Sequence, residues 1–143
     1  MKGIYHNTAS VIIAGAAAGV AVVTGDLAYL DAAAGALFGI FAGPDQDQLT
    51  INKAEWAVVK YLPVGGWLWL ALWDLYARAI PHRSPVSHFP IIGTAGRALY
   101  LAALWLLAAW WQQYDTALVL QIPPGFFVGW AVSDAAHFVM DLF

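Results

Sequence analysis

Four apolar segments separated by short polar breaks dominate the chain, and they span residues 8–23, 27–42, 91–111 and 124–143. The first two are rich in Ala and Gly, which suits close packing between helices. At 1.5 Å per residue each of these two would cover about 24 Å, less than a hydrocarbon core of about 30 Å, so flanking residues must extend them. The pattern predicts an all-α fold with about four transmembrane helices.

Residues 55–80 do not fit a simple span. The stretch "EWAVVKYL" is amphipathic, "PVGG" interrupts a helix, and "WLWLALWDLYARAI" has apolar length for about two-thirds of a bilayer. Asp74 and Arg78 are spaced for an ion pair between successive turns. This composition predicts a helix that lies in the membrane interface or re-enters on its own side. We therefore expect residues 1–143 to form one membrane-embedded domain.

Composition supports the membrane assignment. Hydrophobic residues make up 62% of the chain and the mean hydropathy is +0.67, whereas soluble domains contain roughly 45–50% apolar residues. A soluble domain of this size has too much surface to hide so many apolar side chains, although buried helices of a soluble bundle stay open as the alternative. The net charge of −3, without a basic stripe, excludes a nucleic-acid partner. The absence of cysteine excludes disulfides and thiolate metal ligands.

The distribution of charge assigns the two sides of the membrane. If residues 55–80 do not cross, all basic side chains fall on or near one face, and the opposite face carries Asp26 and Asp115. The positive-inside rule then places the basic face in the cytoplasm. The prediction is a multi-pass protein of a bacterial-type inner membrane with both termini cytoplasmic. The basic residues are Lys2, Lys53, Lys60, Arg78, Arg83 and Arg97.

The same topology gathers the histidines at the cytoplasmic face. They are His6, His82, His88 and His137. His82 and His88 lie in "IPHRSPVSHFP", where prolines on both sides stiffen the connection. Taken alone, this segment also fits a solvated interfacial loop.

Two acidic motifs fall at the same face. "GPDQD" places Asp45 and Asp47 at the end of the second apolar segment, although aspartates also occur there simply to form a turn. In "SDAAHFVMD", Asp134, His137 and Asp141 share one helix face. Ionisable residues in a membrane helix usually mark a functional site, although His137 also fits a hydrogen-bonded core residue and Asp141 a solvated helix end. Together these side chains predict a metal site.

The ligand set limits the choice of metal. Imidazole and carboxylate donors without cysteine suit Zn²⁺ first, with Mn²⁺ or Fe²⁺ as alternatives. More donors are present than one ion needs, so the expected content is one to three divalent ions. Such sites activate water and hold the oxygens of a phosphoester. A serine nucleophile is disfavoured, because the chain has no G-x-S-x-G motif.

Four stretches in order, an N-terminal "HN", "GPDQD", "IPHRSPVSHFPIIGTAGRALYL" and "SDAAHFVMD", resemble an uncharacterised family of metal-binding bacterial membrane proteins. That family is similar in turn to the YdjM-like inner-membrane metal-dependent hydrolases. The resemblance covers nearly the whole chain. It implies metal ligands at His6, Asp45, His88, His137 and Asp141, with His82, Asp47 and Asp134 as further ligands or as groups that orient them. Gln48 stands where the broader family often has a histidine.

The favoured hypothesis is a membrane-bound metal-dependent hydrolase that uses metal-activated water on a phosphoester, such as a lipid headgroup. Asp47 or Asp134 would serve as general base, and Arg83 or Arg97 would hold the phosphate. The expected partners are membrane lipids and a small-molecule or lipid substrate, and Ala/Gly faces permit a homo-oligomer. The alternative is a non-enzymatic metal-binding or structural membrane protein. A transporter is the least favoured hypothesis.

Overall fold

The computed structural model describes residues 3–51, 53–112 and 121–142, and over these residues the chain is helical with no strand. The all-α prediction is confirmed. Lys2, Asp115 and Phe143, which entered the charge and span predictions, lie outside the described residues. The elements in order are α1 (Gly3–Thr24), α2 (Ala28–Phe38), the short 3-10 helix η1 (Pro44–Asp47), α3 (Lys53–Tyr61), α4 (Pro63–Ala79), α5 (Pro85–His88), α6 (Pro90–Gln112) and α7 (Pro124–Asp141).

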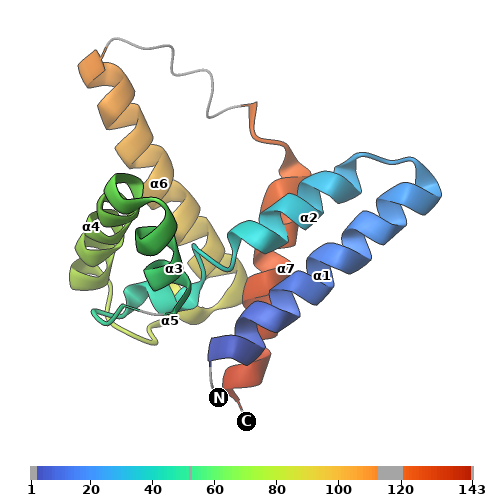
Figure 1. Cartoon of the computed structure of the whole chain (residues 1–143), viewed down its shortest axis with the longest axis horizontal. Helices are drawn as coiled ribbons and strands as arrows, with labels where there is room; N and C mark the ends of the chain where they lie inside the picture. Colours follow the sequence, from blue (N-terminus) through green and yellow to red (C-terminus); the bar gives the residue numbers. More distant parts are fainter. Residues whose placement is uncertain (1–2, 52, 113–120, 143) are drawn as a thin grey trace.

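Helix α7 lies between the pair of helices α1 and α2 and the helix α6. It packs against α1 and α2 on one side and against α6 on the other. Helices α3 and α4 pair with each other, and η1 contacts both α4 and α5. The start of α1 and the end of α7 lie side by side, and the turn between α1 and α2 lies at the other end of α1 (Figure 1).

Proline defines where several helices begin. Helices α4, α5, α6 and α7 all start with this residue, whose missing amide hydrogen costs nothing in the first turn. Helix α3 accordingly ends at Tyr61 and α4 begins at Pro63. Residues 55–80 therefore form two helices packed as a hairpin, which corrects the prediction of a single interfacial or re-entrant helix. At Gly66 the two helices approach so closely that an added Cβ would overlap the backbone of Val59.

Helices α2 and α7 cross with their backbones in contact. A Cβ added at Gly35 would overlap the carbonyl oxygen of Phe126, and one added at Gly129 would overlap that of Ala32. Only glycine fits at such positions, because any side chain would force the two backbones apart. The small residues of the second apolar segment therefore serve close helix packing, as the sequence predicts.

An aromatic core lies between α7, α4 and the end of α2. Trp73, Tyr76 and Trp130 are almost fully buried there and pack with Ala42. The indole Nε1 of Trp130 donates a hydrogen bond to the carbonyl oxygen of Ala42, at 3.0 Å. This bond fixes the chain just after α2, at the point where η1 begins. The core thus supports the polar segment that the sequence singles out as "GPDQD".

Two helices in the described part of the chain are long and apolar enough to cross a membrane, α1 over Tyr5–Thr24 and α6 over Pro90–Gln112. Helix α2 ends at Phe38, short of residue 42, and has only 11 residues. Two such helices are weak support for a membrane protein, because a soluble core helix or an N-terminal signal has the same length and composition. Of the four predicted transmembrane helices, only the first and third, α1 and α6, have this weak support within the described residues.

Candidate metal centre

Five of the predicted ligands come together at the end of the molecule where the termini meet. We call them the His/Asp cluster, and they come from four elements: His6 of α1, Asp45 of η1, His88 of α5, and His137 and Asp141 of α7. The three histidines are buried. Residues up to 135 positions apart in the sequence thus meet in one small volume, as the topology argument predicts.

The ligand atoms of the cluster fall into two sets of three, His6 with Asp45 and His137, and His88 with His137 and Asp141, and the atoms of each set lie within 4.8 Å of one another. The nitrogen–oxygen distances to Asp141 are 3.4 Å from His6 Nε2, 3.4 Å from His137 Nε2 and 3.9 Å from His88 Nε2. Those to Asp45 are 3.6 Å from His137 Nε2 and 4.0 Å from His6 Nδ1. A tetrahedral ion with arms of about 2.1 Å separates its ligand atoms by about 3.4 Å. All five separations exceed the usual length of an N–H···O hydrogen bond.

Several ring nitrogens of the cluster are buried without a hydrogen bond. Both nitrogens of His6 and the Nε2 atoms of His88 and His137 have no hydrogen-bond partner among the described residues. Buried polar atoms are rarely left in this state, because the loss of water is otherwise uncompensated. The donor set of three imidazoles and two carboxylates is one that Zn²⁺, Mn²⁺ and Fe²⁺ accept. The residues present therefore fit a divalent metal ion.

Asp47 holds the imidazole of His88 from the opposite side. Its carboxylate oxygens lie 3.3 Å from His88 Nδ1 and 2.6 Å from His82 Nδ1. The Nε2 atom of His88 consequently faces Asp141. A carboxylate on one ring nitrogen commonly orients a histidine whose other nitrogen binds metal. Asp47 thus lies behind His88 and forms with His82 and His88 a second grouping of potential ligand atoms.

The charge of Asp47 is fixed by its surroundings. Burial by itself would raise its pKa, but hydrogen bonds from His88, Ser87 and His82 and from the Arg83 amide lower the pKa to about 2. The Arg83 amide donates to Asp47 Oδ2 at 2.9 Å. Arg83 has a φ of 59°, an uncommon conformation for a residue with a side chain, and its own side chain is exposed.

Asp45 is also held in its ionised form. Burial acts to raise its pKa, but the neighbouring His137, His6 and His88 lower it overall. Gln48 donates a hydrogen bond from Nε2 to Asp45 Oδ1 at 2.7 Å. Gln48 therefore contacts a predicted metal ligand.

Asp134 does not join the His/Asp cluster. It is 1% exposed and forms an ion pair with the fully buried Arg97, which we call the buried ion pair. Asp134 also accepts a hydrogen bond from Thr94. Arg97 in addition donates to the carbonyl oxygen of Ser87, the residue before His88. The buried ion pair thus ties α6 and α7 to the short helix that carries His88.

His82 is less enclosed than the other histidines. Its side chain is 44% exposed, against 7% for His6 and 9% for His88. Its ionic partner among the described residues is the buried carboxylate of Asp47. The structure therefore places this predicted ligand beside the cluster, with its ring open to solvent.

Some contributors were not identified from the sequence. Ser10 of α1 and Ser133 of α7 share a hydrogen bond of 2.7 Å, which joins the helices that carry His6 and His137. The pairing of Arg97 with Asp134 was likewise missed. A signal existed for that pair, since an arginine and an aspartate in the interior of apolar helices each require an opposite charge.

These features define a helical protein with a buried His/Asp cluster suited to a divalent metal. Residues 2–143 match the family described as "Uncharacterized metal-binding protein (DUF2227)", and the chain belongs to that family. No curated protein and no solved structure matches the chain. It is accordingly a metal-binding protein of unknown function, which confirms the predicted metal-binding character and leaves the metal to be identified.

Proposed function

We propose that this protein is a membrane-bound, metal-dependent hydrolase of phosphoesters, with the metal held by the His/Asp cluster. The observation that carries the proposal is the set of buried, unpartnered ring nitrogens beside two carboxylates. Zn²⁺ suits this mixed nitrogen and oxygen donor set best, and five donors leave room for more than one ion. A divalent ion in such a site lowers the pKa of coordinated water and polarises phosphoester oxygens.

The chain's own residues would take distinct parts in this reaction. Asp47, ionised and hydrogen-bonded on both oxygens, would hold His88 and His82 in fixed orientations. His82 is open to solvent and hydrogen-bonded to Asp47, so we assign it the role of proton acceptor from water. The exposed guanidinium of Arg83, next to His82, would bind a phosphate oxygen.

The role of general base, expected from the sequence for Asp47 or Asp134, stays a prediction. A general base must be free to take a proton, and a carboxylate with a pKa of about 2, as in Asp47, is a weak one. Asp134 is engaged by Arg97 and Thr94. For both residues the contacts favour positioning of the ligands over direct proton transfer.

Membrane insertion is the second half of the proposal. Only 17% of the residues in each apolar window of α1 and α6 are buried, unlike the core helices of a soluble protein. Trp110 and Trp111, at 73% and 77% exposure, lie in the last turn of α6, and exposed tryptophans favour a membrane interface. We propose a multi-pass inner-membrane protein with its metal centre at the cytoplasmic face and lipids as partners. A homo-oligomer would use Gly15 and Gly19 of α1, which face open space.

The test combines metal content with turnover. Purified protein should contain at least one equivalent of Zn²⁺, Mn²⁺ or Fe²⁺ by elemental analysis, and His137→Ala should lose it, whereas Asp26→Asn at the exposed turn after α1 should not. A water-soluble phosphodiester and phospholipid vesicles should both be assayed. His82→Gln should keep the metal and lose most of the turnover. Equal trace metal in wild type and His137→Ala would refute the site.

A non-enzymatic role is the second candidate, and one observation favours it. The cluster joins α1, η1, α5 and α7, which are distant in sequence, so a bound ion would brace the bundle. In that case metal removal should lower the midpoint of thermal unfolding, while no phosphoester is cleaved. Turnover by the metal-loaded protein that is absent from His137→Ala would exclude this candidate.

A further inference from the structure

The hairpin of α3 and α4 exposes apolar side chains around its connection. More than half of each of these side chains is exposed, and we call them the hairpin tip: Tyr61, Leu62, Val64, Trp67 and Leu68. Residues 61–73 contain no charged residue. The ion pair of Asp74 with Arg78 lies toward the other end of α4. Helix α4 is therefore apolar where it begins and charged where it ends.

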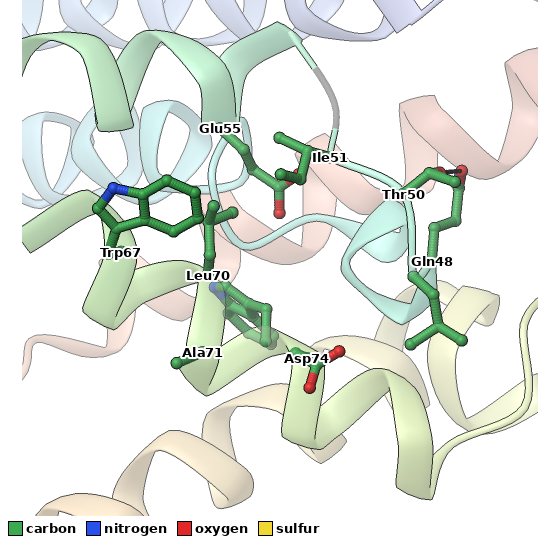
Figure 2. A pocket seen from close by; sticks show the side chains of 10 residues that line it. Gln48, Thr50, Ile51, Glu55, Trp67, Leu70, Ala71 and Asp74 are labelled. Carbon is green, nitrogen blue, oxygen red and sulfur yellow. Dashed lines mark hydrogen bonds between the residues drawn. The ribbon is translucent and has the colours of Figure 1, made fainter. Parts of the chain in front are cut away.

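The apolar surface continues across a groove between α4 and the segment that follows η1 (Figure 2). Trp67 and Leu70 line the groove from α4, and the exposed Leu49 and Ile51 line it from that segment. Six of the ten described lining residues are apolar. A continuous apolar surface that stays exposed usually marks contact with a membrane or with another protein.

The backbone of the connection favours lipid as the partner. The Leu62 amide donates a hydrogen bond to the carbonyl oxygen of Val58, at 2.8 Å. Pro63 has no amide hydrogen, and the Gly66 amide donates to the carbonyl oxygen of Leu62 at 2.5 Å. Backbone groups without a hydrogen bond are costly in lipid, where no water replaces the missing partner. A chain reversal with these bonds therefore enters an apolar layer more readily than an open loop does.

The side chains that border the tip are typical of a membrane interface. The ammonium group of Lys60 lies 5.4 Å from the centroid of the Tyr61 ring. Trp56, one turn earlier in α3, is also exposed. Lysine and aromatic side chains concentrate where lipid headgroups meet acyl chains, because each has an apolar part and a polar part. A lysine so close to the tip favours shallow entry, to a depth of about 5–10 Å below the headgroups.

The hairpin is placed to enter a membrane but is too short to cross one. Helix α4 packs against α6, where the Tyr100 hydroxyl donates to the carbonyl oxygen of Leu72. Helix α6 is one of the two helices long and apolar enough to cross a membrane. The nine residues of α3 rise only about 14 Å, about half of a hydrocarbon core. The connection lies away from the end of the molecule where α1 begins and α7 ends (Figure 1).

We infer that the hairpin tip enters the acyl layer of the leaflet next to the metal centre and returns on the same side. The partner of this surface is lipid, with Lys60 at the level of the phosphates. Helix α4 also packs against η1, so the inserted hairpin would fix Asp45 and Asp47 relative to the membrane surface. The inference rests on the proposed membrane association and is independent of the hydrolase activity.

The absence of cysteine allows a test at single positions. The full-length protein would carry one of four substitutions at exposed side chains, be labelled there with a polarity-sensitive fluorophore, and be placed in vesicles of phosphatidylcholine and phosphatidylglycerol. The substitutions are Val64→Cys and Leu68→Cys in the tip, Leu107→Cys on α6, and Asp26→Cys in the turn after α1. Spin-labelled lipids quench a fluorophore from within the bilayer, and iodide on both sides of the membrane quenches it from water.

The labels in the tip should behave like the label on α6. Their emission should shift to shorter wavelength, and lipid spin labels should quench them more strongly than iodide does. The label at position 26 should show the reverse. Adding Val64→Asp to Leu68→Cys should move the second label toward water, because a charge is costly in the acyl layer. Val64→Leu is the matched control and should leave that label unchanged, and the metal content should stay the same in both variants.

The label on α6 separates this inference from the proposed function. Iodide quenching in the tip together with lipid quenching at position 107 would overturn the inference and leave the insertion of α6 standing. Lipid quenching in the tip together with iodide quenching at position 107 would refute the crossing by α6 and keep the hairpin as a surface anchor. Protection of the tip from both quenchers would identify a protein contact, such as a second copy of the chain, and would also overturn the inference.

Discussion

The His/Asp cluster and the buried ion pair are two groups of buried ionisable side chains whose α7 members, His137 and Asp134, lie about one turn apart. They differ in how closely their opposite charges are paired. In the buried ion pair, Asp134 Oδ2 accepts hydrogen bonds from Arg97 and Thr94, and Arg97 also donates to the carbonyl oxygen of Ser87. Asp134 Oδ1 and Arg97 Nε have no hydrogen bond to the described residues, but the two opposite charges are in direct contact. In the cluster, both nitrogens of His6 and the Nε2 atoms of His88 and His137 face carboxylates at 3.4 to 4.0 Å and have no hydrogen bond to the described residues.

We therefore interpret the buried ion pair as an interaction that stabilises the fold, and the His/Asp cluster as a ligand site. Polar groups that compensate one another inside the protein stabilise the fold without any addition. Polar groups that converge without compensating one another need a further charge to do so, and a divalent cation supplies it. The two regions should therefore respond to different perturbations, the first to substitution of its partner and the second to removal of metal.

The largest effect is expected from Arg97→Met. The substitution leaves Asp134 as an uncompensated buried charge, and breaking such a pair typically costs about 3–5 kcal/mol in the free energy of unfolding. Chemical denaturation followed by circular dichroism measures this loss. The double variant Arg97→Met with Asp134→Leu should recover much of it, since both charges are then removed. A single variant as stable as the wild type would show that the pair is not buried as described.

Metal removal should affect the cluster by a somewhat smaller amount. An ion present at about one hundred times its dissociation constant stabilises the folded state by about 2.7 kcal/mol. Chelation should therefore lower the midpoint of thermal unfolding of the wild type, and added Zn²⁺ should restore it. His137→Ala is the control, because its unfolding should not respond to chelator. An identical response of the two proteins would contradict the cluster as the site of the ion.

Asp47→Asn tests whether the orientation of His88 matters. Loss of a carboxylate that orients a metal-binding histidine usually weakens metal affinity about 10- to 100-fold, or roughly 1.4–2.8 kcal/mol. The variant should still bind the same number of ions when metal is in excess. Competition with a chromophoric chelator gives the affinity, and Asp26→Asn provides the reference. A loss of stoichiometry instead of affinity would make Asp47 a ligand itself.

The smallest effect is expected at the hydrogen bond between Ser10 and Ser133. Ser10→Ala removes a buried bond between two neutral hydroxyls, so the loss in the free energy of unfolding should be about 0.5–1.5 kcal/mol. Metal affinity should change little, because neither hydroxyl belongs to the cluster. A large fall in metal affinity in this variant would show that the bond also sets the distance between His6 and His137.

Much of the candidate site could be predicted from the sequence because charge is so scarce in this chain. Few polar residues interrupt the apolar segments, so a topology that collects the basic residues also collects His6, Asp45, His88 and His137 at one end. The same argument cannot give contacts between particular atoms. It proposed Asp134 as a catalytic group, whereas the structure pairs it with Arg97, 37 residues away.

The fold was predictable in class and less so in detail. Apolar length alone suggested a second helix to residue 42, but α2 ends at Phe38, where turns over residues 39–43 lead into η1. Gly39 packs directly against Ser133 of α7, a contact that no local pattern reveals. The hairpin of α3 and α4 likewise depends on the tertiary contact at Gly66, and Pro63 alone indicates only where the chain can break.

The backbone contact between α2 and α7 has a mechanical consequence for the distant metal centre. Gly129 lies at the crossing, and His137 follows eight residues later, about 12 Å further along the helix. A small rotation of α7 about this crossing would therefore move His137 by a larger distance than residues near Gly129. A tilt of α7 by about 5° would displace His137 by about 1 Å, a shift large enough to change the reactivity of a site substantially. The absence of a side chain at Gly129 therefore helps to set the position of a predicted metal ligand about two helical turns away.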